Sequence, residues 1–165
     1  MLFPPSTAAR YFSMCDASDL IARNANYPFM LDDEVWQTVE HYYQANKFVD
    51  AQYRQRVRQA VTAEQARELG RSWWRRKRPD YKQVRTTLMT RAVYTQCRTH
   101  SELRNRLLDS GNIPLVENSQ FDYFWGCGRD QRGLNHFGEV LMNIRQKLQE
   151  EGADDSPSSS RHPQS

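Results

Sequence analysis

The chain has 165 residues, of which 38% are hydrophobic and 12% aromatic, and this length is sufficient for one domain with its own core. No apolar run approaches the roughly 20 residues that a membrane-spanning helix needs, which excludes a helical membrane protein. The formal net charge of +3 is too small to require nucleic acid as a partner.

Cysteine and histidine form no pattern of a metal site or a disulfide framework. Cys15, Cys97 and Cys127 are odd in number, widely spaced and without a CxxC pair. The four histidines show no metal-ligand spacing, and no GxSxG motif marks a nucleophile. The first ten residues, MLFPPSTAAR, lack the basic start of a signal peptide. We therefore expect a reduced, cytoplasmic protein without a bound metal or a membrane partner.

The first half of the chain is predicted to be mostly helical. The segment ARYFSM (9–14) favours a short edge strand, and the spacing of apolar residues predicts a helix from about Asp33 to Arg58. Thr62 and Gln65 form a capping box for the short helix that follows, which Gly70 ends.

Two further helices are expected in the middle of the chain. Asp80 follows the Arg-Pro step and is placed to cap a helix that runs to about Gln96. Thr99 and Glu102 form a second capping box, and the helix that they open closes at Gly111.

The last third of the chain differs in composition. IPLVE (113–117) and FDYFWG (121–126) are β-branched or aromatic and predict two strands, and a helix is expected over 135–149. The predicted fold class is therefore α+β, a helix-rich single compact domain with a small sheet. The domain is expected to span residues 1–148, and the polar segment 149–165 is expected to be a disordered tail.

A polar stripe runs through the aromatic segment VEHYYQANKF. At 3.6 residues per turn, Trp36, Glu40, Tyr43 or Gln44, and Lys47 fall on one face of the predicted helix. The stripe is either a solvated outer face or the wall of a pocket, and periodicity alone favours the solvated face.

The segment FDYFWG carries a carboxylate close to a tryptophan. As a strand it would place Asp122 and Phe124 on one face and Tyr123 and Trp125 on the other. This arrangement suits a site that stacks a planar base and holds a sugar, and it equally suits an edge strand with a solvated aspartate.

A glycine-rich loop, GCGRDQRGLN, follows that segment. Its glycines, Gly126, Gly128 and Gly133, precede a predicted helix, where backbone N–H groups can bind an anion. A P-loop is excluded because Leu134 and Asn135 stand where Lys and Ser or Thr are needed. From spacing alone, a tight turn that requires positive φ explains the glycines better than an anion site does.

The stretch GRSWWRRKRPDYK concentrates cations around two adjacent tryptophans. Interleaved cations and aromatic rings can bind phosphates and stack bases. A solvated loop with one tryptophan in the core is an equally ordinary interpretation. A single phosphate needs only one or two of these arginines, and we include Arg78 among the candidates.

Taken together, several segments resemble the NADAR (YbiA-like) superfamily in order and approximate spacing. The resemblance covers roughly 11–148, nearly the whole predicted domain, and the combination is more specific than any one piece. The segments that carry it are YFS, WQTVEHYYQANKF, ARELGR, RPDYKQVRTTLMTRA and LVENSQFDYFWGCGRDQRGLNHFGEVLMNIR.

The resemblance implies an N-glycosidase of compact, helix-rich α+β fold without a metal or organic cofactor. Members hydrolyse the bond between C1′ of ribose 5-phosphate and an amine on a pyrimidine, in the reactive early intermediates of riboflavin biosynthesis. Related members remove ADP-ribose from guanine in nucleic acid. The implied partner is a phosphoribosyl or ADP-ribosyl small molecule, with nucleic acid in the second case.

The resemblance also implies site residues, position by position. Glu40 and Lys47 match the glutamate and lysine of the family's helix, Asp122 and Trp125 match its D-x-x-W-G segment, and Asn135 matches the asparagine after the glycine loop.

This chain departs from the family pattern in two places. Tyr81 stands where many members have a tryptophan, and the usual F-S-N-F segment reads IARN at 21–24, so Asn24 replaces the missing asparagine only if the loop shifts. These departures affect substrate choice more than the type of reaction.

Glycosidic cleavage builds positive charge on the ribose, and a carboxylate stabilises that charge or handles the proton. Glu40 and Asp122 are the candidates for these roles. Lys47 is expected either to neutralise the 5′-phosphate or to attack C1′ as an amine, and Trp125 and Tyr81 to stack the base. The other expected substrate-binding residues are Gly126, Gly128, Asn135, Gln44 and Arg78.

Three functions follow from these observations. The first is an N-glycosidase for ribosylamino-pyrimidine phosphates, and the second is a hydrolase that removes ADP-ribose from guanine in nucleotides or nucleic acid. The third is a non-catalytic sensor that binds a nucleotide or ADP-ribose. The sequence contains no signal for the oligomeric state.

Overall fold

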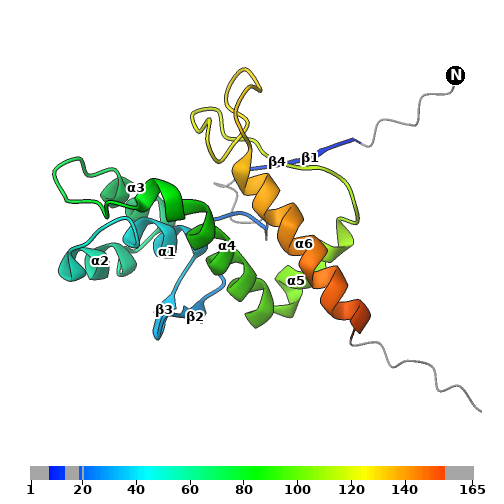
Figure 1. Ribbon diagram of the computed structural model, residues 1–165, viewed down its shortest axis with the longest axis horizontal. Helices are drawn as coiled ribbons and strands as arrows, with labels where there is room; N and C mark the ends of the chain where they lie inside the picture. The colour runs from blue at the N-terminus through cyan, green and yellow to red at the C-terminus, as the bar shows by residue number, and fades with distance from the viewer. Residues whose placement is uncertain (1–7, 14–18, 20, 155–165) are drawn as a thin grey trace, which may run out of the picture.

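The computed structural model describes residues 8–13, 19 and 21–154 (Figure 1). The predictions for 1–7 and for the tail over 155–165, together with Cys15, lie outside the described residues. The elements, in chain order, are β1 (Arg10–Phe12), β2 (Phe29–Leu31), β3 (Glu34–Trp36), α1 (Val39–Ala45), α2 (Ala51–Arg58), α3 (Ala63–Gly70), α4 (Tyr81–Thr99), α5 (Ser101–Asp109), β4 (Leu115–Glu117) and α6 (His136–Asp154).

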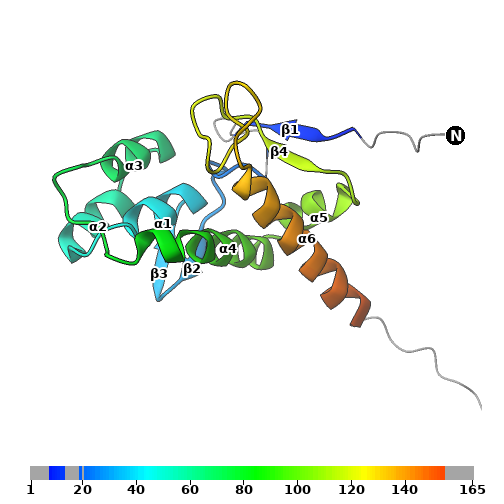
Figure 2. The same cartoon turned by 45° about the horizontal axis from the view of Figure 1, so that its top comes forward.

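The central element is the short helix α1, and all seven of its residues are buried. Thr38 caps it, since its hydroxyl accepts a hydrogen bond from the His41 N–H. Around α1 lie α2, α3 and α4, and α4 in turn packs against α5 and α6. Figures 1 and 2 show α1, α2 and α3 on one side of α4, with α5 and α6 toward its other end. The α+β, helix-rich prediction is confirmed.

The single helix predicted over 33–58 is wrong, because two local signals interrupt it. Asp32 and Asp33 both have positive φ (53° and 61°), the conformation of a two-residue hairpin turn, and they join β2 to β3. Asp50 then starts α2 by accepting hydrogen bonds from two backbone N–H groups. The helix is therefore divided into a hairpin, α1 and α2, with Lys47 in the connection between the two helices.

The predicted limits of the third helix are confirmed. The Thr62 hydroxyl accepts from the Gln65 N–H at 3.1 Å, the Gln65 side chain accepts from the Val61 N–H at 2.7 Å, and α3 ends at Gly70. If position 70 carried a side chain, its Cβ would lie 1.8 Å from the amide oxygen of Gln44, which is too close. The glycine therefore permits close packing of α3 against α1.

The capping box predicted at Thr99 and Glu102 is wrong. Helix α4 continues to Thr99, whose hydroxyl donates to the Thr95 carbonyl within the helix, and His100 precedes α5. Helix α5 ends before Ser110 and Gly111, and Gly111 has a φ of 61°, which confirms the predicted stop.

A second pair of strands joins the two ends of the domain. The strands β1 and β4 are parallel, with Tyr11 opposite Val116, which confirms the strands predicted in ARYFSM and IPLVE. Asn135 holds β4 to the start of α6: its side chain accepts from the Glu117 N–H at 2.9 Å and donates to the Leu115 carbonyl at 2.9 Å.

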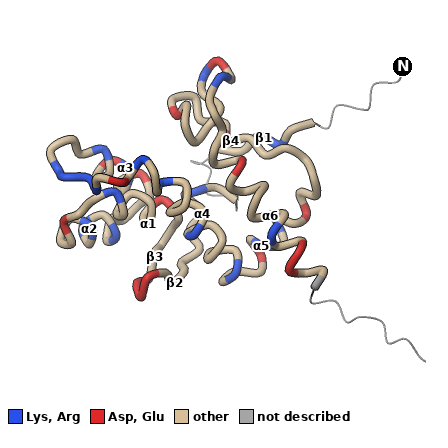
Figure 3. The backbone as a smooth tube through the Cα atoms, viewed as in Figure 1, with Lys and Arg blue, Asp and Glu red and all other residues tan. Residues whose placement is uncertain are grey.

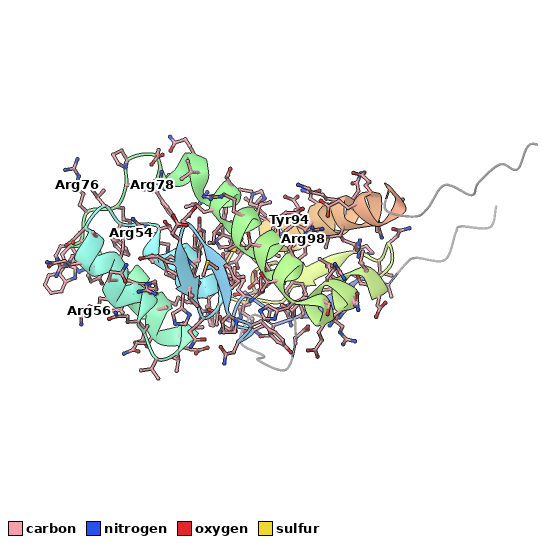
Figure 4. All side chains as sticks on the ribbon, turned by 90° about the horizontal axis from the view of Figure 1, so that it is seen from below. Arg54, Arg56, Arg76, Arg78, Tyr94 and Arg98 are labelled. Atoms are coloured by element: carbon pink, nitrogen blue, oxygen red, sulfur yellow. The ribbon has the colours of Figure 1, made fainter. Side chains whose placement is uncertain are left out.

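The last helix, α6, begins at His136 and continues to Asp154, five residues beyond the predicted Gln149. A contact with α4 explains this extension, because Glu151 accepts hydrogen bonds from the Tyr94 hydroxyl at 2.6 Å and from Arg98 at 3.1 Å (Figure 4). Although α4 and α6 have 19 residues each, neither they nor the other described helices are apolar enough to cross a membrane.

Candidate active site

A cavity of about 720 Å³ lies between α1 and the segment 118–125. Its walls also include residues from the turn before β2, from the end of α3 and from the start of α4. It is lined mainly by charged and aromatic side chains, and the lining residues used below are Arg23, Glu40, Tyr43, Gln44, Lys47, Arg67, Arg71, Tyr81, Arg85, Phe121, Asp122, Phe124 and Trp125.

At one side of this cavity a single arginine joins three carboxylates. Arg23 is 2% exposed, and its guanidinium lies 2.9 Å from Glu117, 3.3 Å from Glu40 and 3.4 Å from Asp122. Burial disfavours the charged guanidinium, but the three carboxylates outweigh it and raise the pKa of Arg23 above its ordinary value. Sequence reasoning missed Arg23. The available signal was an arginine that directly follows two apolar residues in IARN.

Glu40 is the buried acid of the first turn of α1, with no exposed surface. Its carboxylate lies 3.3 Å from Arg23 and 3.4 Å from Arg67, and it accepts a hydrogen bond from the Gln44 amide at 2.5 Å. Burial alone would raise the pKa of Glu40, yet the two arginines and the amide lower it. Glu40 is therefore an ionised carboxylate at neutral pH.

Asp122 lies in a turn, so the strand predicted over 121–126 is wrong. Its Oδ1 accepts from the backbone N–H groups of Phe124 at 3.1 Å and Trp125 at 2.8 Å, which folds the chain back on itself. The two predicted faces of a strand do not exist here. The turn directs Oδ2 to Arg23 at 3.4 Å, and thus brings Asp122 to the guanidinium that also pairs with Glu40.

Glu117 is the third carboxylate and was also missed. It is fully buried on β4, and Arg23 donates to its Oε1 through both Nε (3.2 Å) and a terminal nitrogen (2.9 Å). Burial raises its pKa above the ordinary value despite the guanidinium. A period-two pattern was the available signal, because Glu117 lies two residues after the buried Leu115 and on the same strand face.

Lys47 lies just beyond the end of α1, where the chain leaves the helix. Its ammonium is 5.0 Å from the ring centre of Tyr43 and 5.6 Å from that of Tyr81. No carboxylate of the described residues lies within 4.0 Å of it. Burial lowers the pKa of Lys47 to about 8, although Glu40 opposes this shift. A substantial fraction of this amine is therefore neutral slightly above neutral pH.

Three aromatic rings form a continuous wall of the cavity. Tyr43 contacts Trp125 edge-on, with ring centres 5.3 Å apart, and accepts a hydrogen bond from the indole N–H at 3.1 Å. The Tyr43 hydroxyl also hydrogen-bonds that of Tyr81. Trp125 and Tyr81, the predicted stacking residues, are thus brought together by Tyr43, which the sequence placed on the polar stripe without a role in the site.

The arginines of the cavity are more numerous than the sequence indicated. Arg67 and Arg71 come from α3 and its C-terminal end, and Arg85 from α4. The Arg85 guanidinium lies 3.3 Å from the ring centre of Phe124, and its buried Nε has no hydrogen-bond partner among the described residues. These side chains make the cavity suitable for phosphate.

Four predicted site residues do not line the cavity. Arg78 pairs with the neighbouring Asp80 at 2.6 and 2.9 Å, so the predicted cap Asp80 makes no side-chain cap hydrogen bond to α4. Asn135 holds β4 to α6, as described above.

The two predicted glycines are packed against neighbouring residues. Gly128 has a φ of 69° with the Tyr123 ring against it, and Gly126 packs on the backbone of 117 and 122. The glycines here serve a tight turn.

We expect Arg23→Met to destabilise the protein by about 3–5 kcal/mol at pH 7.5, because it leaves buried carboxylates without a counter-charge. This loss of unfolding free energy should become smaller toward pH 5. Without the guanidinium the pKa of Glu40 rises, so the variant's carboxylates take up protons as the pH falls. Urea unfolding at pH 7.5 and at pH 5 measures the unfolding free energies of the variant and the wild type. The control is Arg106→Met, at an exposed position of α5. An equal loss at both pH values would contradict the charge argument.

Comparisons with known proteins show the family of this chain. The NADAR domain model matches residues 3–149. N-glycosidase Npun_R5314 of Nostoc punctiforme is 46% identical over 121 residues, covering 72% of this chain and 78% of its own. N-glycosidase YbiA of Escherichia coli is 32% identical over 142 residues, covering 86% of this chain and 89% of its own.

The chain is also similar to a solved structure and to a segment of a longer protein. The NMR structure of E. coli YbiA has a TM-score of 0.82 at 30% identity and covers 95% of this chain and 92% of that one. Riboflavin biosynthesis protein VVA0006 of Vibrio vulnificus is 38% identical over 115 residues, which are 70% of this chain and 31% of that protein. By its sequence and its fold, this chain belongs to the NADAR domain family.

Proposed function

We propose that the protein is an N-glycosidase that hydrolyses the N-glycosidic bond of ribosylamino-pyrimidine 5′-phosphate intermediates of riboflavin biosynthesis. The reaction releases ribose 5-phosphate and the pyrimidine amine. Relatives named N-glycosidase match most of this chain, and a protein named for riboflavin biosynthesis carries a matching segment. These names and the composition of the cavity support the proposal.

One observation carries this proposal. Glu40 and Asp122, 82 positions apart in the sequence, both contact the guanidinium of Arg23 and both line the cavity that also contains Lys47. A site with two carboxylates, an amine of lowered pKa and an aromatic wall has the groups needed to cleave a bond between a sugar and a planar base.

The roles of the two acids follow from their surroundings. Glu40 is held ionised by Arg23 and Arg67, so it is suited to stabilise the positive charge that develops at C1′. Asp122 is the more accessible acid, with its side chain 26% exposed against 0% for Glu40. We assign to Asp122 the transfer of the proton that the leaving amine needs. Trp125 and Tyr81 would stack the pyrimidine beside these acids.

Lys47 is assigned the role of an amine nucleophile. A lysine that only neutralises phosphate gains nothing from a pKa near 8, whereas a nucleophile must lose its proton. Once the sugar opens, Nζ adds to C1′ and the pyrimidine amine leaves with a proton. Water then hydrolyses the C1′–Nζ Schiff base, which frees Lys47 and ribose 5-phosphate. In this scheme Arg71 and Arg85 bind the 5′-phosphate.

A second candidate function is the removal of ADP-ribose from guanine. The observation that favours it is the number of cations: Arg67, Arg71 and Arg85 line the cavity together with Lys47, more than one phosphate needs. A diphosphate would use the additional arginines. The cavity volume of about 720 Å³ is within the range of sites for ligands of this size.

We expect Glu40→Gln to lower kcat by about 100-fold or more, because the amide removes the charge that stabilises the transition state. Binding of ribose 5-phosphate should change little, since the amide keeps the shape of the side chain. Turnover and calorimetric binding should be measured on the same preparations, with Glu102→Gln on α5 as the control. An unchanged rate would remove Glu40 from the mechanism, and wild-type protein that binds without turnover would be a sensor.

For Lys47, we expect kcat/KM to rise with pH and to level off near pH 8, because the neutral amine is the reactive form and is lost below its pKa. Borohydride added during turnover should attach the sugar phosphate to the protein, with the added mass on the Lys47 peptide. Lys47→Arg should abolish both turnover and trapping. If this variant keeps kcat and raises only KM, Lys47 is a phosphate ligand instead.

A further inference from the structure

Two adjacent tryptophans are exposed beside the cavity, where the fold makes no use of them. Trp73 is 90% exposed and Trp74 79% exposed, although tryptophan is usually well buried in folded domains. They lie in the segment 71–78 between α3 and α4, which we call the tryptophan loop. The same segment contains five arginines and lysines, which the charge-coloured trace shows as a blue run (Figure 3).

The tryptophan loop is anchored to the body of the protein. The Arg78 N–H donates to the Lys47 carbonyl at 2.8 Å, and the Val49 N–H donates to the Arg76 carbonyl at 3.3 Å. The Arg75 guanidinium lies 4.8 Å from the ring centre of Tyr53. The tryptophans are therefore presented to solvent by a segment with defined hydrogen bonds to the chain around Lys47.

The cations of the loop are only partly neutralised. Arg75 lies 3.5 Å from Asp50, and Arg78 pairs with Asp80. Among the described residues no carboxylate lies within 4.0 Å of Arg71, Arg76 or Lys77. Figure 4 shows Arg76 projecting from the loop away from the helices. The surface thus carries unneutralised positive charge next to two aromatic rings.

The loop is continuous with the cavity, whose lining also includes exposed aromatic residues. Arg71, the first residue of the loop, lines the cavity. Phe121 is 90% exposed and also lines the cavity, as does the partly exposed Tyr123. Exposed flat rings are thus present both in the cavity lining and in the tryptophan loop, together with cations.

We propose that the tryptophan loop binds single-stranded nucleic acid. Trp73 and Trp74 stack on unpaired bases, and Arg71, Arg76 and Lys77 contact the phosphates, so that the strand passes the mouth of the cavity. Single strands fit better than a duplex, whose bases are already stacked. A membrane surface fits less well, because four cations directly follow the tryptophans and no further apolar side chains accompany them. This inference goes beyond the proposed hydrolysis and does not depend on it.

The test is fluorescence anisotropy with a labelled single-stranded oligothymidylate of about a dozen nucleotides, near the site size of such surfaces. The double variant W73A/W74A should bind it about tenfold or more weakly, whereas W73F/W74F should largely restore binding. Arg76→Ala should lower the slope of log affinity against log salt by about 0.7. The controls are Met30→Ala, an exposed apolar residue of β2, and Arg106→Ala on α5.

Hydrolysis of the small phosphoribosyl substrate, measured on the same proteins, separates this inference from the proposed function. W73A/W74A should retain it, because neither tryptophan lines the cavity. Unchanged oligonucleotide binding in W73A/W74A would overturn the inference while leaving the hydrolase intact. Binding to phosphatidylserine vesicles without binding to the oligonucleotide would overturn it in favour of a membrane surface. If the wild type binds the oligonucleotide without hydrolysing the small substrate, and W73A/W74A loses that binding, the result would support the inference but not the proposed function.

Discussion

A buried guanidinium that pairs with three carboxylates is the interaction on which the site depends. Arg23, Glu40, Glu117 and Asp122 come from four separate parts of the chain, and each carboxylate lies within 3.4 Å of the same side chain. Removing such a group from water is unfavourable unless its partners are in place, so the turn at 21–24, α1, β4 and the turn at 122 must assemble together. The same contacts hold Glu40 ionised in a place without solvent exposure.

A few side chains of the surrounding fold hold the residues of this cluster in position. Capping by Thr38 sets the start of α1 and therefore the place of Glu40, while Asn135 fixes β4 and therefore Glu117. The Asp122 side chain shapes its own turn and places Trp125 against Tyr43. The charges are also graded: the pKa of Glu40 is lowered, that of Glu117 is raised and that of Lys47 is lowered to about 8. Groups of different proton affinity thus meet in one cavity, as acid–base chemistry requires.

Local signals in the sequence predicted much of this arrangement. The capping box at Thr62, the stop at Gly70 and the strands around Tyr11 and Val116 depend on neighbouring residues, and all are present. The resemblance to the NADAR family, and not a local signal, indicated Glu40, Lys47, Asp122 and Trp125, and these residues line the cavity together with Tyr81.

What escaped prediction depends partly on local turns that the apolar periodicity concealed, and partly on contacts across the chain. The helix expected over 33–58 gives way to a hairpin turn, in which Asp32 and Asp33 have positive φ, and FDYFWG is bent because its own aspartate accepts two backbone hydrogen bonds. Arg23 is paired only through tertiary contacts, which periodicity cannot reveal. Arg78 and Asn135 belong to motifs that matched, but their side chains form hydrogen bonds with Asp80 and with β4 and do not line the cavity.

The central claim is that this cavity cleaves a bond between C1′ of ribose and an amine. Its most direct test is to incubate the purified protein with the ribosylamino-pyrimidine phosphate intermediates and with ADP-ribosylated guanine DNA, and to measure the released base and sugar by mass spectrometry. We predict ribose 5-phosphate and free pyrimidine amine in equal amounts from the intermediates. Release of neither base nor sugar from either substrate by correctly folded protein would contradict the account.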